Sequence, residues 1–173
     1  MKYYFPTCTE NFNNIFSTHS ISPYNFYINR KFGIKRFTKT PDNPSEDFLL
    51  LSNKPFHNRI DQDSMSENYP VLIEISSDLL NNKYIIEHDC TPSPKLPLGF
   101  KEDNNELTII SYPKTIYLDP DKTTFYFKDK RSKKYALTRA TLTIEPKKIS
   151  LFKLVDSYPQ TSVGSTKFSK QLN

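Results

Sequence analysis

Residues 71–75 read VLIEI, and this stretch indicates that the fold is built on a β-sheet. It is short, apolar and rich in β-branched side chains, and Pro70 and Ser76 bound it, which is typical of a buried strand. A similar stretch, TTFYFK at residues 123–128, follows the sequence DPDK at residues 119–122, which predicts a hairpin turn. The chain is therefore expected to form a sheet around these segments.

The remaining patterns extend this sheet and add a helix near the N-terminus. Alternating or apolar runs predict strands at residues 3–5, 48–51, 84–87, 107–111, 115–118, 135–145 and 149–155. Thr7 and Glu10 have capping-box spacing, and Phe12, Ile15 and Phe16 then form one apolar helical face. We predict an α+β domain over residues 1–156, with a mostly antiparallel β-sheet and short N-terminal helices, and a polar C-terminal tail over residues 157–173.

The amino-acid composition argues against several classes of protein. The chain has 173 residues, enough for one domain with its own core, and only three glycines, which argues against a phosphate-cradling loop. Two cysteines, Cys8 and Cys90, do not make a disulfide framework. The sequence shows no signal peptide and no apolar run of about 18 to 20 residues. We expect a cytoplasmic protein of a bacterium or mobile element, with no membrane partner.

Charge is distributed unevenly along the chain. The formal net charge is +5, but residues 1–41 carry six cations and one anion, and residues 128–173 carry eleven cations and three anions. Residues 42–127 carry seven cations and fifteen anions. The acidic middle either neutralises the two basic ends within the fold or leaves them free to form one basic surface.

An aromatic-basic block at residues 24–39, YNFYINRKFGIKRFTK, is the strongest candidate binding feature. No acidic residue occurs between Glu10 and Asp42. Rings beside cations can stack on a ligand and neutralise its charge. The alternative is ordinary packing, with the rings in the core and the cations in water. The candidate binding residues are Tyr24, Tyr27, Arg30, Lys31, Phe32, Lys35, Arg36 and Lys39.

A second basic run, KDKRSKK at residues 128–134, is interpreted as a solvated hairpin loop. No metal site is predicted. His88, Asp89 and Cys90 are adjacent, so on a strand they would not converge on one ion. Nothing flanking the cysteines or histidines marks an activated nucleophile.

The N-terminal sequence YYFPTCTENFNNIFSTHSISP resembles the start of ADP-ribosyltransferase-fold proteins, particularly toxins that modify DNA. Thr7, Asn11 and Phe12 stand at places similar to those of the family's opening motif and helix, whereas Phe5 and Pro6 replace its opening His or Arg. The resemblance implies an enzyme that uses NAD as its cofactor, with Tyr24 or Tyr27 stacking on nicotinamide. Its late-strand catalytic glutamate would be Glu145, or else Glu74.

Three functional hypotheses follow from the sequence. The first is a non-enzymatic binding module that engages nucleic acid or an acidic protein through the basic-aromatic block, without a cofactor. The second is the NAD-dependent ADP-ribosyltransferase. The third is a subunit or domain of a larger assembly, whose neighbours supply the chemistry.

Overall fold

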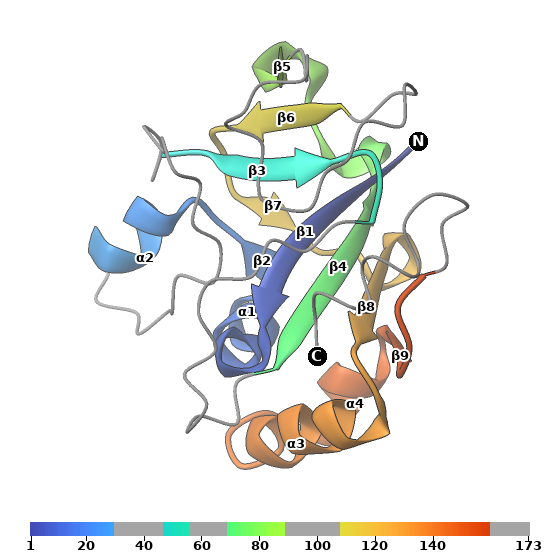
Figure 1. The fold of residues 1–173 in the computed structure, drawn as a ribbon. Helices are drawn as coiled ribbons and strands as arrows, with labels where there is room; N and C mark the ends of the chain where they lie inside the picture. Colours follow the sequence, from blue (N-terminus) through green and yellow to red (C-terminus); the bar gives the residue numbers. More distant parts are fainter. Residues whose placement is uncertain (30–46, 56–68, 89–107, 160–173) are drawn as a thin grey trace.

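The computed structural model describes residues 1–29, 47–55, 69–88 and 108–159. Within these ranges the chain forms an α+β fold with a seven-stranded, mostly antiparallel sheet in the order β5-β6-β3-β1-β4-β8-β9 and a small sheet of β2 and β7 (Figure 1). The strands are β1 Lys2–Cys8, β2 Ser20–Ile21, β3 Leu49–Ser52, β4 Pro70–Ser76, β5 Ile86–His88, β6 Ile109–Tyr112, β7 Ile116–Tyr117, β8 Thr123–Phe127 and β9 Lys153–Val155.

Strand β1 lies at the centre of the sheet. It is antiparallel to β4 along its whole length, from the pair Lys2 and Ser76 to the pair Cys8 and Pro70. On its other side β1 pairs with β3, and β4 pairs with β8. Only the last pair, β8 with β9, is parallel, because helices connect these two strands in a crossover.

Four α-helices and four 3₁₀ helices occur in the described residues. The α-helices are α1 Phe12–Thr18, α2 Tyr24–Asn29, α3 Lys130–Ala140 and α4 Pro146–Ser150. The 3₁₀ helices are Thr9–Asn11, Ser77–Leu79, Asn82–Tyr84 and Pro120–Lys122. Figure 1 shows α3 and α4 at one end of the molecule, below β8 and β9.

An aromatic cluster joins α1 to the sheet. Phe12 and Phe16 on α1 are buried, with ring centroids 4.2 Å apart. Both contact Phe125 of β8, at 5.6 Å and 4.8 Å, and Phe16 also contacts Phe152 at 5.2 Å. The VLIEI strand supplies Val71, Ile73 and Ile75 to the same core. Burying these large side chains stabilises the packing of the helices on one face of the sheet.

Several predictions are confirmed. The VLIEI segment is β4, with its apolar side chains fully buried, and TTFYF is β8. The face of Phe12, Ile15 and Phe16 lies on α1 as expected. The start of this helix differs from the prediction because Thr7 is still in β1. The chain enters α1 through the 3₁₀ turn Thr9–Asn11, and no side-chain capping hydrogen bond is made at either N-cap.

The prediction of a strand at residues 135–145 is wrong, as is that of a hairpin loop at residues 128–134. Residues 130–140 form α3, the longest helix in the described part of the chain. The alternating pattern of YALTRATLTIE is misleading because the helix buries small side chains, Ala136 and Ala140, that give little hydrophobic signal. A helix therefore stands where the hairpin loop was expected.

Two further corrections concern neighbouring segments. The sequence DPDK is a 3₁₀ turn rather than a hairpin turn, because β7 before it pairs with β2 and β8 after it pairs with β4. The strand predicted at residues 149–155 begins only at Lys153, since Ile149 and Ser150 end α4. Pro146 at the start of α4 favours the helix there.

Candidate functional site: a basic surface on α3 and α4

Helix α3 is fixed at its start by a reciprocal cap and along its length by small buried residues. The Asp129 carboxylate accepts a hydrogen bond from the Ser132 N–H at 2.7 Å, and the Asp129 N–H donates to Ser132 Oγ at 3.1 Å. Ser132, Ala136 and Ala140, spaced four residues apart, are buried and turn one side of α3 toward the core. The opposite side is left to solvent.

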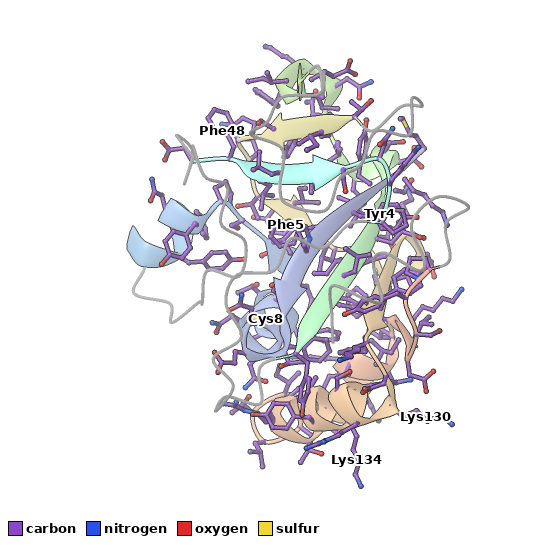
Figure 2. The ribbon with its side chains drawn as sticks, in the orientation of Figure 1. Tyr4, Phe5, Cys8, Phe48, Lys130 and Lys134 are labelled. Carbon is purple, nitrogen blue, oxygen red and sulfur yellow. The ribbon has the colours of Figure 1, made fainter. Side chains whose placement is uncertain are left out.

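Five cations on α3 and α4 form what we call the basic surface. Its members are exposed: Lys130, Arg131, Lys134, Lys147 and Lys148. In the part of the chain that the structure describes, none of these five side chains makes a hydrogen bond or an ion pair. Lys130 and Lys134 project away from the body of the protein (Figure 2). The basic surface therefore carries charge that the described fold does not neutralise.

The cations at the start of α3 oppose the electrostatic preference of that helix. Lys130 and Arg131 occupy the first turn of α3, where the positive end of the helix dipole favours acidic side chains. Lys130 and Lys134 are four residues apart, so their like charges are neighbours on the helix surface. Neither α3 nor α4 contains an acidic residue. An anion bound here would relieve both repulsions.

Two other cations of α3 are engaged within the fold. The Lys133 ammonium donates to the Leu154 carbonyl at 2.8 Å, which ties α3 to β9. Arg139 donates to the Tyr135 hydroxyl at 2.9 Å and stacks over that ring at 5.6 Å. The Tyr69 ring also contacts Tyr135 in an edge-on arrangement, with ring centroids 5.8 Å apart. Lys133, Arg139 and Tyr135 are therefore engaged in contacts within the fold.

The aromatic-basic block is described only in its first residues. Tyr24 and Tyr27 lie on α2, and Tyr24 is partly exposed. Tyr27 is 3% exposed, and its hydroxyl accepts a hydrogen bond from the Ser22 N–H at 3.0 Å. Burial raises the pKa of Tyr27. The Tyr27 ring thus packs in the core rather than facing a ligand. The other candidate residues lie outside the described residues: Arg30, Lys31, Phe32, Lys35, Arg36 and Lys39.

Glu145, the glutamate that the ADP-ribosyltransferase resemblance implies, does not lie on a strand. It is exposed and is the N-cap residue of α4. The expectation of a late-strand glutamate at this position depended on the strand at residues 135–145, which is a helix and a turn instead. Glu145 therefore lacks the setting that the resemblance requires of it.

Glu74, the alternative glutamate, is the centre of a buried polar cluster. Glu74 Oε2 accepts hydrogen bonds from the hydroxyls of Tyr4 at 3.0 Å and Tyr126 at 3.1 Å. Glu74 Oε1 forms an ion pair with the Lys2 ammonium at 2.7 Å. The three strands β1, β4 and β8 each contribute to the cluster. Both carboxylate oxygens are engaged, so the cluster acts as a tie across the centre of the sheet.

The cluster also changes the chemistry of its two tyrosines. Burial, then the negative charge of Glu74, raises the pKa of Tyr126 to about 12. Burial and the hydrogen bond to Glu74 likewise raise the pKa of Tyr4. Both phenols therefore stay protonated and donate to the carboxylate near neutral pH. A charged residue inside the apolar VLIEI run is the one signal of this cluster in the sequence.

The described residues contain neither a metal-binding cluster nor a membrane-spanning helix. In them, no group of three or more His, Cys, Asp or Glu side chains is placed to hold a metal ion, and no helix is long and apolar enough to cross a bilayer. Of the adjacent His88, Asp89 and Cys90, only His88 is described, at the end of β5. Cys8 is buried in β1 and is not part of a disulfide.

Comparisons of the chain with protein-family models, with curated proteins and with solved structures find no match. Two features of the described residues stand out as possible sites, the Glu74 cluster and the basic surface. In the Glu74 cluster, both carboxylate oxygens are engaged by other members of the cluster. The basic surface is exposed and unneutralised by its described neighbours, and it is the candidate functional site.

Proposed function

We propose that this chain is a non-enzymatic binding module that holds an anionic macromolecule on the basic surface of α3 and α4. One observation carries the proposal: five exposed cations on adjacent helices have no ion pair among the described residues. Their fields add over a common region and raise the local concentration of a negatively charged partner. Nucleic acid and an acidic protein both satisfy this requirement.

The positions of the cations on α3 favour a role in binding over that of surface charges without a function. Cations in the first turn of a helix and like charges four residues apart each reduce helix stability. In α3 this occurs at a helix whose cap and buried side are otherwise well formed. Residues that reduce the stability of the helix in which they lie are expected at functional positions, where binding of a partner compensates for the lost stability.

The proposal predicts a steep dependence of binding on salt. If all five cations of the basic surface met phosphates of duplex DNA, the affinity would fall about 500-fold between 50 and 200 mM salt, because bound counterions are released. Contacts with carboxylates on a protein would also weaken with salt through screening. A binding site built on apolar packing alone would not respond in this way.

A matched pair of charge variants tests the proposal. Binding of the protein to a 30-base-pair DNA duplex and to poly-L-glutamate is measured by fluorescence anisotropy at 50 mM salt. The variant Lys130→Glu/Lys134→Glu should lose at least about tenfold in affinity for whichever polymer binds. The control Lys83→Glu/Lys114→Glu makes the same change in net charge at exposed positions outside α3 and α4. If both polymers fail to bind, or if both variants weaken binding equally, the proposal is wrong.

A further inference from the structure

Two leucines beside the basic surface are unusually exposed. Leu142, in the turn between α3 and α4, is 80% exposed, and Leu151, directly after α4, is 60% exposed. Along the chain they stand on either side of α4 and its two lysines. The three other large hydrophobic residues exposed in the described part of the chain lie on other elements: Met1, Ile86 and Tyr117.

The leucines distinguish between the anionic partners that the basic surface could hold. Leucine side chains gain free energy only when apolar surface covers them. A phosphate backbone offers charge and no such surface, and single-stranded nucleic acid is bound by stacking its bases on aromatic rings. The ring on α3, Tyr135, already has Arg139 over its face and Tyr69 in edge-on contact.

An anionic lipid surface fits the arrangement less well than a protein does. A helix that binds in the plane of a membrane presents a continuous apolar face to the lipid. The apolar side of α3, formed by Ala136 and Ala140, is packed into the core, and its exposed side carries Lys130 and Lys134. The available apolar contacts are two separate side chains within a charged region. Such a pattern is typical of a protein interface, where apolar anchors lie among complementary charges.

We infer that the partner is a protein segment rich in acidic residues and carrying apolar side chains, which pair with the basic surface and cover Leu142 and Leu151. This inference rests on the proposed function and names the chemical class of the partner. The occupant is assigned from charge complementarity: the basic surface provides five exposed cations, and neither helix contains an acidic residue. Acidic side chains supply the long-range attraction, and the leucines lengthen the lifetime of the complex.

Polymers of defined chemistry test the inference with the full chain. The probes are poly-L-glutamate, a random glutamate–tyrosine copolymer of the same length, a 30-base-pair DNA duplex, and phosphatidylcholine vesicles with and without phosphatidylserine. The copolymer should bind at least about tenfold more tightly than poly-L-glutamate and than DNA. The variant Leu142→Ser/Leu151→Ser should bind the copolymer only as tightly as it binds poly-L-glutamate, and its affinity for poly-L-glutamate should be unchanged.

The control variant is Tyr117→Ser, which removes an apolar side chain that is 74% exposed on β7. It should bind every probe as the wild type does. The inference is overturned if the leucine variant binds the copolymer normally, if DNA binds more tightly than the copolymer, or if phosphatidylserine vesicles are bound in a leucine-dependent manner. Failure of every probe would instead refute the proposed function itself. If a polymer binds the wild type and the leucine variant equally well, only the assignment of the partner is refuted.

Discussion

Replacing Lys130 by Glu should make the protein more stable while making it a poorer binder. Lys130 is the first residue of α3, after the N-cap Asp129, and Lys134 lies one turn further on. The substitution removes a cation from the positive end of the helix dipole and places an anion there, with each change contributing about 0.3–1 kcal/mol. It also converts a repulsive pair with Lys134 into an attractive one, and such pairs contribute about 0.2–0.5 kcal/mol each.

Because Lys130 is exposed and Asp129 adds a nearby negative charge, the lower end of these ranges applies, which gives about 1 kcal/mol in the free energy of unfolding. For a chain of this length the gain corresponds to a rise in Tm of about 2–4 °C. Urea unfolding at 25 °C in low salt measures it, with Lys130→Gln as the control that should show about half the gain. The gain should shrink in 1 M salt, where charges are screened within about 3 Å.

A Lys130→Glu variant that is no more stable than the wild type in low salt would refute the electrostatic reasoning. So would a gain that persists unchanged in 1 M salt, because the gain would then come from something other than charge. Weaker binding to the polyanion probes is expected from the same variant. Stability and affinity should therefore move in opposite directions, which a general loss of folding could not produce.

Three further predictions concern the core. The pKa of Tyr126, raised to about 12 by burial and by Glu74, should fall toward 10 in Glu74→Gln when followed by absorbance at 295 nm. The Tyr126 phenol ionises at a lower pH in the unfolded chain than in the folded protein, so the free energy of unfolding should fall between pH 10 and about 12. The fall should be smaller in Tyr126→Phe, and a free energy of unfolding that does not change over this pH range would contradict the prediction. In a Cys90→Ser background, the buried Cys8 thiol should react with a thiol reagent only after denaturation, and rapid labelling of the native protein would disprove its burial. His19 has φ 48° at the end of α1, so His19→Gly should be about 1 kcal/mol more stable than His19→Ala by urea unfolding, whereas equal stabilities would exclude backbone strain there.

The sequence predicted those parts of the fold in which one short segment carries its own signal. The run Val71–Ile75 is apolar and β-branched throughout, and Phe12, Ile15 and Phe16 repeat at helical spacing. Local patterns of this kind specify an element regardless of its neighbours. For that reason, the α+β class and the antiparallel sheet could be predicted from the sequence.

Helix α3 was missed because its buried side is made of small residues. Ser132, Ala136 and Ala140 give little hydrophobic signal, whereas the alternating Leu and Thr residues that follow are typical of a strand. The spacing of Asp129 and Ser132 was the available indication of a helix start. Without the helix, the cations of residues 128–134 were assigned to a loop, and the placing of Lys130 and Lys134 one turn apart on a helix could not be predicted.

The partners of Glu74 in its cluster could not be predicted from local sequence. Its partners Tyr4 and Tyr126 are separated from it by 70 and 52 residues. Only the pairing of β1 and β8 on either side of β4 brings the three side chains together. A contact between such distant residues depends on the topology of the sheet and not on any pattern along the chain.

The central position of β1 has a consequence for the order of folding. During synthesis this strand is made first, yet its neighbours β3 and β4 begin only at Leu49 and Pro70, so it must wait unpaired until they have emerged. Strand β8 also depends on a distant neighbour, because it pairs with β4 as well as with β9. Contacts between distant segments require costly loop closure and slow the folding of such sheets. Pairing of β1 with β3 and β4 at the centre of the sheet is therefore expected to be a late step of folding.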